Sequence, residues 1–485
     1  MLFLYDDLAP PPGAIRQIIS IDHFGDLLKR RRRLSDMIED IVVRQCGQQF
    51  LRISDPASRK ALTDRLERRI DDAPVFRLPS CLMPTDIAAF VLAVRKLPYA
   101  LGSVIFGDQC DDEAAMLLSQ AEVLALFRID DPGERRAFFA TVSDRATRLN
   151  NGMRLVDLRE IGTFLQYMIG ATEARHFNDT RVANGIFRKA STDKAKMEAE
   201  YRFFHAMPEP MRRFFLPTFD FQETATGASY AMENMPIPDA AIQFVHNAFE
   251  PASFDTLLAR FFDFLATRER EPVGTARVRE TANREIVGKM HRRIEQLMAT
   301  DTGRRLDTLM KASGPFGGVL DMQARFTPLI ERALMRDGSD ALAVSHGDPC
   351  LSNILFNREI GLFRLIDPRG ALTRDDALMH PLYDVAKFSH SVMGGYDFIN
   401  NGLFDCQLDD GLTLTLALHE GGPPAWMRQA FQARVKEAGF DMVAVRATEL
   451  SLFMSMLPLH MDAPRKLPGF CLAACRIAEE LEGRG

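Results

Sequence analysis

The chain has 485 residues, seven scattered cysteines and a formal net charge of −6 at pH 7. This length favours two domains, and the charge gives no indication of nucleic-acid binding. The cysteines have no metal-ligand or disulfide spacing, and no apolar run reaches the roughly 18 residues of a transmembrane helix. Because Met1–Asp7 lacks the basic flank and long apolar core of a signal peptide, we expect a cytoplasmic protein.

Residues 1–155 alternate short apolar runs with helical patterns, which is typical of a small α/β domain. Its role is not indicated by any motif. The expected strands are Ala14–Ile21, Val75–Leu78 and Ser103–Phe106, and the expected helices are Asp86–Lys96 and Glu113–Phe127.

Five consecutive cations, Lys29 to Arg33, stand out in this domain. On a helix they would point in all directions, and acidic residues lie nearby between positions 26 and 40, so a solvated, ion-paired helix is the first interpretation. The alternative is a weak contact between Lys29–Arg33 and an anionic lipid surface or phosphorylated partner.

A strand followed by a helix is predicted after residue 185. Ile186–Ala190 is the strand, after an Asn184-Gly185 turn, and Arg175–Asn178 begins its hairpin partner. The helix is Lys194–Ala206, with N-cap chemistry from the three residues before it.

This helix places an acidic residue on an apolar face. Met197, Glu200, Tyr201 and Phe204 follow the i, i+3, i+4, i+7 spacing of one face. A carboxylate there needs a partner, and Lys189 on the preceding strand is the obvious one. Glu198 points away from this face, so Glu200 is preferred.

Two more antiparallel strands are expected next, followed by a largely helical region. The strands are Thr218–Gln222 and Ser229–Met235, the strongest helical periodicity is in Phe254–Thr267 and Asn283–Met298, and Gly314–Gly318 marks a break.

The most informative motif is Ser345–Leu355, which reads His-x-Asp-x4-Asn through His346, Asp348 and Asn353. A second apolar strand after it ends in Asp367. The strands Ile354–Phe356 and Leu362–Ile366 form a predicted hairpin, which would bring Asn353 close to Asp367.

These residue types suit phosphoryl transfer, which requires positioned phosphates, neutralising metal and a base near the nucleophile. Asp348 could accept the proton of an attacking hydroxyl. Asn353 and Asp367 offer the hard oxygen ligands that Mg²⁺ prefers. The motif therefore predicts transfer from a nucleotide to a small acceptor.

Over roughly residues 170 to 480 the chain resembles the aminoglycoside phosphotransferase and choline kinase-like family, which shares the protein-kinase fold. The resemblance lies in Ser345–Leu355, Ile366–Gly370 and Pro381–Lys387. More narrowly, Ala174–Asn178, the Asp-Pro-Arg-Gly segment and Phe388–Asp397 are similar to phosphotransferase-type proteins of bacterial capsule and surface-polysaccharide biosynthesis.

The resemblance implies an α+β architecture, with a bilobal kinase-like domain that has a helical C-lobe and follows the small α/β domain. The N-lobe would span 156–236 and the C-lobe 237–485. The implied ligands are ATP and Mg²⁺, bound together with a small-molecule acceptor.

The resemblance also implies a role for each site residue. Asp348 would be the catalytic base, and Asn353 and Asp367 the metal ligands. Lys189 would hold the phosphates and Glu200 would hold Lys189. The remaining implied roles are bracing of the catalytic loop by His346 and Asp384, and backbone contacts to adenine near Glu233 and Met235.

The sequence departs from protein-kinase motifs at several positions, which narrows the predicted class of kinase. No Gly-x-Gly-x-x-Gly loop precedes Lys189, and only Gly185 is nearby. The residues after Asp367 are Pro-Arg-Gly, and no Ala-Pro-Glu segment follows, which argues against a protein kinase. The acidic residues Asp375, Asp376, Asp397 and Asp405 could meet a cationic amino alcohol or the hydroxyls of a sugar.

The sequence favours a small-molecule kinase that acts on a sugar or sugar-like alcohol in surface-polysaccharide biosynthesis. One alternative is a pseudokinase that binds nucleotide as a scaffold in a polysaccharide-assembly complex; the intact Asp348, Asn353, Asp367 and Lys189 argue against it. The other is a bifunctional enzyme with a second transferase activity in the N-terminal domain, which a polar pocket with convergent carboxylates there would favour.

Overall fold

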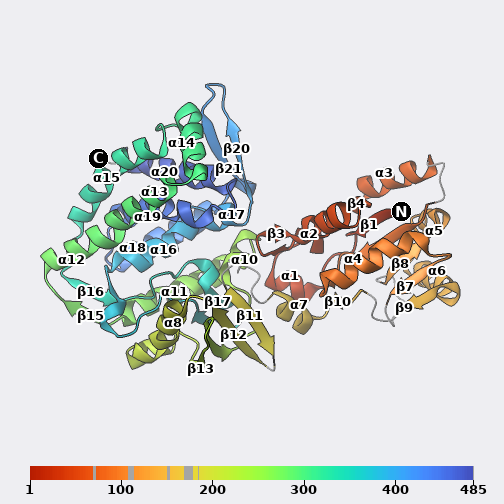
Figure 1. Cartoon of the computed structure of the whole chain (residues 1–485), viewed down its shortest axis with the longest axis horizontal. Helices are drawn as coiled ribbons and strands as arrows, with labels where there is room; N and C mark the ends of the chain where they lie inside the picture. Colours follow the sequence, from red (N-terminus) through yellow and green to blue (C-terminus); the bar gives the residue numbers. More distant parts are fainter. Residues whose placement is uncertain (69–72, 107–113, 150–152, 169–177, 184, 484–485) are drawn as a thin grey trace. The chain divides into compact units, whose positions relative to one another are not determined.

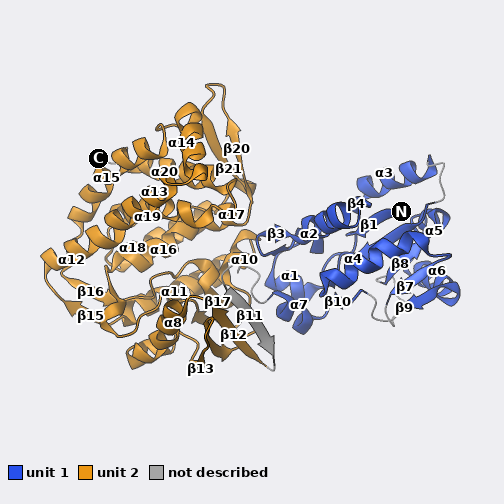
Figure 2. Cartoon of the chain, viewed as in Figure 1, with its two compact units in different colours: residues 1–171 blue, residues 172–485 orange. Residues whose placement is uncertain are grey.

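The computed structural model describes residues 1–68, 73–106, 114–149, 153–168, 178–183 and 185–483. The chain divides into two compact units, residues 1–171 and 172–485 (Figure 2). This division comes later than the expected end of the first domain at residue 155. The reason is that helix α7 (Ile161–Met168) packs against β10 (Leu155–Asp157) and α1 (Gly13–Ile18), both in the first unit.

The first unit is built on a six-stranded sheet in the order β4-β1-β5-β8-β7-β9 (Figure 1). The central strand β1 pairs in parallel with β4 and β5, whereas β8 is antiparallel to β5 and β7. Helices separate most of the strands, which gives the α/β arrangement expected for this part of the chain. The strands of this sheet are β1 (Leu2–Asp6), β4 (Gln49–Ile53), β5 (Val75–Pro79), β7 (Val104–Phe106), β8 (Ala115–Leu118) and β9 (Thr147–Leu149).

Helices and short strands complete the first unit. They are β2 (Leu28–Lys29), β3 (Arg32–Arg33), α2 (Leu34–Asp40), α3 (Pro56–Glu67), β6 (Leu82–Pro84), α4 (Ile87–Lys96), α5 (Gln120–Leu126) and α6 (Pro132–Arg145).

Two expected elements of this unit differ in the structure. The expected strand Ala14–Ile21 instead begins as helix α1, whose Ile15 is buried, and the chain leaves the helix at Ile19, which is extended and also buried. The expected helix Glu113–Phe127 contains strand β8 and then α5, separated by Ser119, whose side chain caps the helix with Glu122. Four fully buried apolar residues form β8, and so short an apolar run fits a strand or a helix equally well.

The cluster of cations is a tight hairpin and not a helix. Lys29 and Arg32 pair across β2 and β3, and the turn residues Arg30 and Arg31 have positive φ values of 48° and 64°. Arg32 forms an ion pair with Asp40 at 3.4 Å. The expected ion pairing is present, but the expected helix is wrong, because local periodicity cannot reveal a turn of two left-handed residues.

Acidic residues at the end of β1 are already paired with arginines. The Asp6 carboxylate accepts from Arg77 at 2.6 Å, and both side chains are almost fully buried. The fully buried Asp7 carboxylate pairs with Arg52 at 2.6 Å. These carboxylates neutralise buried cations, which is a structural role that needs no ligand.

The second unit begins with a four-stranded antiparallel sheet in the order β11-β12-β14-β13, with helix α8 against it. Every strand expected here is present, although β14 ends at Glu233 and not at Met235. Residues 175–177 of the expected hairpin partner lie outside the described residues. The elements are β11 (Asn178–Ala183), β12 (Ile186–Ser191), α8 (Lys194–Ala206), α9 (Glu209–Arg212), β13 (Thr218–Glu223) and β14 (Ala228–Glu233).

The rest of this unit is mostly helical, and its described residues also form three small sheets of two or three strands (Figure 1). Its helices are α10 (Ala240–Val245), α11 (Pro251–Thr267), α12 (Thr275–Ala282), α13 (Gly288–Met298), α14 (Asp301–Ser313), α15 (Val319–Arg336), α16 (Leu382–Val392), α17 (Tyr396–Asn400), α18 (Ala425–Glu437), α19 (Met442–Met456) and α20 (Lys466–Glu482). Its strands are β15 (Arg270–Pro272), β16 (Ala341–Val344), β17 (Ile354–Asn357), β18 (Leu362–Leu365), β19 (Leu378–Met379), β20 (Phe404–Leu408) and β21 (Leu414–Leu418).

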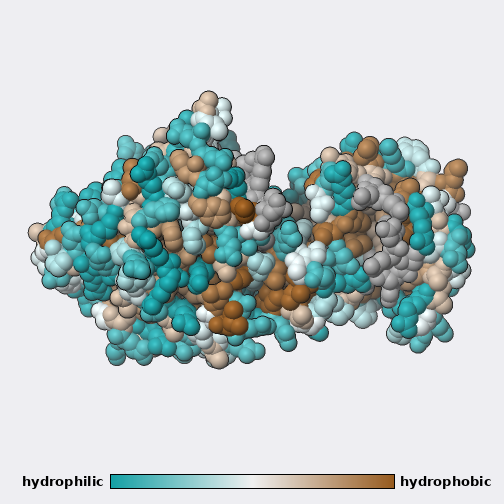
Figure 3. Space-filling view, turned by 90° about the horizontal axis from the view of Figure 1, so that it is seen from below, coloured by the Kyte–Doolittle hydropathy of each residue, from teal (hydrophilic) through white to brown (hydrophobic). Residues whose placement is uncertain are grey.

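Helix α19 is the centre of this helical part, where it contacts α13, α15, α16 and α20. The segment Met442–His460 is long and apolar enough to cross a membrane by length and composition, but 78% of its most apolar window is buried inside the unit. Burial among other helices accounts for that composition. The surface view in Figure 3 shows mainly hydrophilic residues on one face, with apolar residues in small patches.

Candidate active site

The loop after β16 carries the His-x-Asp motif and is shaped by Gly347. This residue has a φ of +81°, which favours glycine. A Cβ at Gly347 would lie 2.7 Å from the Cβ of Arg369, so the segment after Asp367 packs directly on this loop. The backbone N–H of Arg369 donates to the carbonyl of His346 at 2.9 Å. The His-x-Asp loop and the segment after Asp367 therefore hold each other in place.

A buried ion pair that involves α16 stabilises the same loop. The carboxylate of Asp384 on α16 accepts from the backbone N–H groups of His346 (3.1 Å) and Gly347 (2.8 Å). It also pairs with Arg268 at 3.2 Å, and both side chains are fully buried. Burial lowers the pKa of Arg268, and the Asp384 carboxylate opposes that effect. Asp384 braces the loop, as the resemblance implied.

His346 is fully buried, and its ring connects the loop after β16 to Ile366, the residue directly after β18. Its Nε2 donates to the carbonyl of Ile366 at 2.9 Å, while Nδ1 accepts from the N–H of Asp348 at 3.1 Å. The ring stacks on Phe215, with 5.8 Å between centroids. Burial lowers the pKa of the ring. Since Nδ1 accepts and Nε2 donates, these bonds require the neutral imidazole, which suits a positioning residue and not an acid or base.

Asp348 is partly exposed and forms an ion pair that the sequence did not reveal. Its carboxylate is 33% exposed and lies 2.9 Å from Nζ of Lys387, one turn after Asp384 on α16. Burial lowers the pKa of Lys387, but the Asp348 carboxylate together with Tyr383 and Cys350 outweighs burial and raises that pKa above its usual value. A lysine therefore holds one oxygen of the Asp348 carboxylate.

Asn353 directly precedes β17 and Asp367 follows β18 by two residues, so the predicted hairpin brings them to the same end of the strand pair. Strands β17 and β18 pair in register, and the N–H of Ile366 donates to the carbonyl of Asn353 at 3.0 Å. The Asn353 side-chain amide donates to the Asp348 carbonyl at 2.8 Å, which leaves the amide oxygen for another partner. Asp367 has a positive φ of 54°, an uncommon backbone conformation that turns the chain at its carboxylate.

This donor set fits Mg²⁺. In the part of the chain that the structure describes, no group of three or more His, Cys, Asp or Glu side chains could hold a metal ion. One carboxylate with one amide oxygen is nevertheless a sufficient protein contribution for Mg²⁺, which keeps several waters and takes further ligands from phosphates. Asn353 and Asp367 are the two residues that would hold it.

Lys189 forms the predicted ion pair with Glu200. The distance from Nζ to the carboxylate is 2.9 Å, and both side chains are almost fully buried. Nζ also lies 2.7 Å from the carboxylate of Asp367. Glu198 is instead partly exposed and pairs with Arg202 at 2.8 Å. The helix phase deduced from the apolar face is confirmed.

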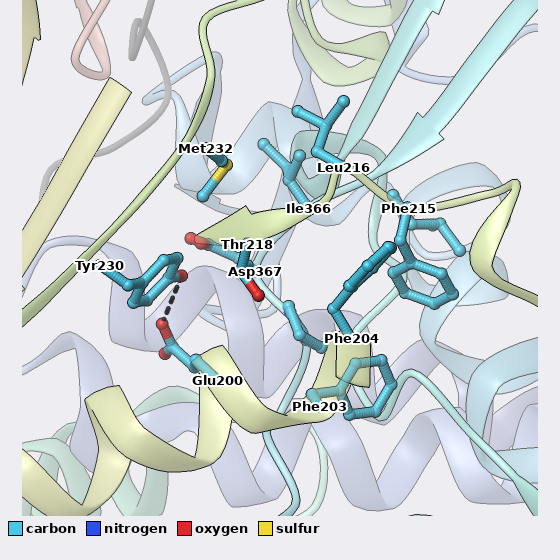
Figure 4. A pocket seen from close by; sticks show the side chains of 12 residues that line it. Glu200, Phe203, Phe204, Phe215, Leu216, Thr218, Tyr230, Met232, Ile366 and Asp367 are labelled. Carbon is cyan, nitrogen blue, oxygen red and sulfur yellow. Dashed lines mark hydrogen bonds between the residues drawn. The ribbon is translucent and has the colours of Figure 1, made fainter. Parts of the chain in front are cut away.

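A small enclosed pocket lies beside this ion pair (Figure 4). Glu200 from α8 and Tyr230 from β14 face each other across it, and the Tyr230 hydroxyl donates to the carboxylate at 3.0 Å. Asp367 lies close by. The volume is about 20 Å³, which is room for roughly one water molecule. The lysine, both carboxylates and the tyrosine thus form one compact polar cluster under the sheet.

Comparisons with known proteins were made on sequence and on structure. No family model matches the chain, and no curated protein matches its sequence. The structure is similar to that of a thermostable mutant of the aminoglycoside phosphotransferase APH(4)-Ia in its apo form. The match has 11% identity and a TM-score of 0.39, and it covers 66% of this chain and 99% of that one.

Two further solved structures are similar at the same low level. One is a ternary complex of a variant of that enzyme with ADP and hygromycin B (11% identity, TM-score 0.38, 66% of this chain and 98% of that one). The other is an aminoglycoside-3'-phosphotransferase of type VIII (15% identity, TM-score 0.32, 58% of this chain and 94% of that one).

Glu233 and Met235 lie at the end of the sheet, where the resemblance placed the adenine contacts. Glu233 is exposed and pairs with Ile186 across β12 and β14. Met235 is partly buried against the core of the sheet, and its carbonyl accepts from the N–H of Ile237 at 2.8 Å. Their role in nucleotide binding stays a prediction.

Sequence reasoning missed the residues that support the motif from distant elements. Arg268, at the end of α11, reaches Asp384 across more than a hundred residues of chain. Lys387 was visible as part of Pro381–Lys387, and its position three residues after Asp384 on one helix was a usable signal. Lys289 on α13, which donates to the Tyr383 hydroxyl at 2.5 Å, had no signal in the sequence.

Proposed function

We propose that the chain is an ATP- and Mg²⁺-dependent phosphotransferase that acts on a hydroxyl group of a small molecule. The observation that carries this proposal is the placement of two ion pairs on two segments, after β16 and after β18, that are hydrogen-bonded to each other. On the segment after β18, Asp367 lies 2.7 Å from Lys189, which is held by Glu200. On the segment after β16, the partly exposed carboxylate of Asp348 is held by Lys387 at 2.9 Å.

In the proposed reaction, the acceptor hydroxyl attacks the terminal phosphorus of ATP. A new O–P bond forms, the bond from that phosphorus to the bridging oxygen breaks, and ADP leaves. Asp348 accepts the hydroxyl proton. Lys189 neutralises phosphate charge, and Asn353 and Asp367 would hold Mg²⁺, which supplies further neutralisation when bound.

We further propose that the acceptor is a sugar or sugar-like alcohol of surface-polysaccharide biosynthesis, phosphorylated in the cytoplasm. This narrower proposal is supported by the likeness of the Asp-Pro-Arg-Gly segment and Phe388–Asp397 to phosphotransferase-type proteins of that process. Likeness of this kind is weaker support than site geometry, because one fold serves many acceptors.

A screen for acceptor-dependent ADP formation tests the proposal. The purified chain is incubated with ATP and neutral sugars, amino sugars, choline or glycerol, with Mg²⁺ or with EDTA. We expect turnover with at least one acceptor, dependent on Mg²⁺ and abolished in Asp367→Ala, which removes the only carboxylate of the proposed metal site. Nucleotide binding with no turnover of any acceptor would favour the scaffold alternative.

Replacement of Lys189 by Met should raise the KM for ATP and lower kcat. The chain should stay folded, because Glu200 keeps the Tyr230 hydroxyl at 3.0 Å and Lys196 at 3.6 Å. Steady-state kinetics measure the effect, and circular dichroism checks the fold. The matched control is Lys194→Met, since Lys194 is partly exposed and pairs with Glu223 at 3.0 Å; unchanged kinetics in both variants would contradict the assignment.

A further inference from the structure

A second cavity borders the catalytic loop in the helical part of the second unit. Its volume is about 320 Å³, which is in the range of small-molecule sites. One wall comes from α13 and the residues just before it, and the other from the segment that follows Asp367. The residues that matter below are Arg284, Glu285, Lys289, Arg292, Arg369 and Asp376.

The lining has an excess of cations without carboxylate partners. Arg284 is neutralised by Glu285, with 3.2 Å between guanidinium and carboxylate. Within the described ranges, however, Lys289, Arg292 and Arg369 form no ion pair with any carboxylate. Lys289 donates to a neutral hydroxyl, that of Tyr383, and the Arg369 guanidinium lies 3.9 Å from the neutral thioether of Met379.

The second carboxylate of the lining, that of Asp376, offsets only one of these three cations. Asp376 accepts from the backbone N–H and the hydroxyl of Thr373, at 3.0 and 2.8 Å, and so caps its own turn. Burial lowers the pKa of Lys289, and the like charges of Lys387 and Arg369 lower it further. Cations gathered in this way are stabilised when an anion enters between them.

We infer that this cavity receives an anionic group, a phosphate or a carboxylate, of the acceptor whose hydroxyl reacts at Asp348. The inference rests on the proposed phosphotransferase function. Arginine and lysine side chains recognise phosphates and carboxylates through charge-assisted hydrogen bonds. A phosphorylated sugar or a sugar acid with a free hydroxyl fits this description, whereas a cationic amino sugar or choline would be repelled.

The position of the cavity assigns the anion to the acceptor and not to the nucleotide. Lys189, Glu200 and Asp367 are absent from its lining. Arg369 instead packs on Gly347, the residue directly before Asp348. Lys289 contacts Tyr383, which lies one helical turn before Lys387, the partner of Asp348. The cavity is thus connected to the base through one turn of α16.

In this arrangement the anionic group of the acceptor takes no part in the bond changes. The hydroxyl oxygen forms the new bond to phosphorus, its proton passes to Asp348, and ADP leaves as before. The acceptor product therefore carries its original anion and one new phosphate.

Two measurements test the inference, with Arg292→Gln/Arg369→Gln as the main variant. In calorimetry with inorganic phosphate, this variant should bind about tenfold more weakly or worse than the unchanged chain. Lys189→Met should retain this binding, because Lys189 does not line the cavity. The charge-matched control Arg277→Gln/Arg279→Gln removes two exposed arginines of α12, one of which pairs with Glu280 at 2.7 Å, and it should also bind normally.

The second measurement compares kcat/KM for glucose, glucose 6-phosphate, gluconate and glucosamine. We expect at least one anionic compound to exceed glucose by about tenfold or more, and this preference to disappear in the double variant. The phosphate and carboxylate arms separate the two anion sources.

Preference for glucose or glucosamine, or undiminished phosphate binding by the double variant, would overturn the inference while the phosphotransferase proposal stands. Phosphate binding at the two arginines with no acceptor phosphorylated would support the anion site and count against the phosphotransferase proposal.

Discussion

Replacement of Asp348 by Asn should lower turnover by about 10²-fold or more and leave nucleotide binding nearly intact, as expected for the loss of a positioned base. The amide cannot accept the proton of the acceptor hydroxyl. It is nearly the same size, so the loop should keep its shape, since Asp384 holds the loop through the backbone of His346 and Gly347.

The experiment separates base catalysis from a general loss of structure. Turnover is measured with the best acceptor from the screen, and ATP binding by calorimetry. Asp410→Asn makes the same chemical change at an exposed carboxylate in the same unit and should leave both quantities unchanged. Equal turnover of Asp348→Asn and the unchanged chain would mean that Asp348 is not the base.

The ion pair of Asp348 with Lys387 affects both the catalysis and the stability of the Asp348→Asn variant. A cation at 2.9 Å favours the charged carboxylate, so Asp348 starts the reaction able to accept a proton. In Asp348→Asn the buried Lys387 loses that counter-charge, and part of any fall in stability comes from this second residue. The stability of Asp348→Asn should therefore be measured beside its kinetics.

Local sequence signals were sufficient for the parts of the site that are close together in the chain. The spacing of Met197, Tyr201 and Phe204 fixed the phase of α8, so the choice of Glu200 over Glu198 was correct. The hairpin that carries Asn353 and Asp367 was readable from two apolar runs and the residues between them. In both cases fewer than twenty residues determine the geometry.

Partners from distant elements could not be predicted in the same way. Arg268 meets Asp384, and Lys289 meets Tyr383, only because α11, α13 and α16 pack around the catalytic loop. The periodicity of one helix does not predict which residues of another helix it will contact. The excess of cations in the second cavity is invisible in the sequence for this reason, and the acidic residues nearby left both a cationic amino alcohol and a sugar open as acceptors.

The misassigned elements of the first unit have a related cause. The arginine-rich segment has helical composition, yet it forms a hairpin because Arg30 and Arg31 adopt left-handed conformations. Strand β8 is stabilised by its neighbours β5 and β7 and not by its own pattern. Tertiary pairing overrides local propensity where a segment is short and fully buried.

Replacement of Asp384 by Ala should reduce the free energy of unfolding of the second unit by about 3–5 kcal/mol, because it leaves a buried charge without its partner. Arg268 and Asp384 are both fully buried and 3.2 Å apart. The guanidinium would keep only neutral acceptors, among them the Ser345 hydroxyl and the Pro381 carbonyl. The N–H groups of His346 and Gly347 would also lose their acceptor.

The single tryptophan makes this measurement specific to the second unit. Trp426 is the only tryptophan of the chain and packs on Phe254, with ring centroids 5.5 Å apart, so its fluorescence in a urea titration reports unfolding of this unit. Asp384→Asn, which keeps an acceptor oxygen, should be less destabilising than Asp384→Ala. The control is Asp263→Ala, which breaks an exposed pair with Arg213 and should cost at most about 1 kcal/mol. If Asp384→Ala and Asp263→Ala unfold at the same urea concentration, the buried pair does not stabilise the loop, and the bracing role assigned to Asp384 is wrong.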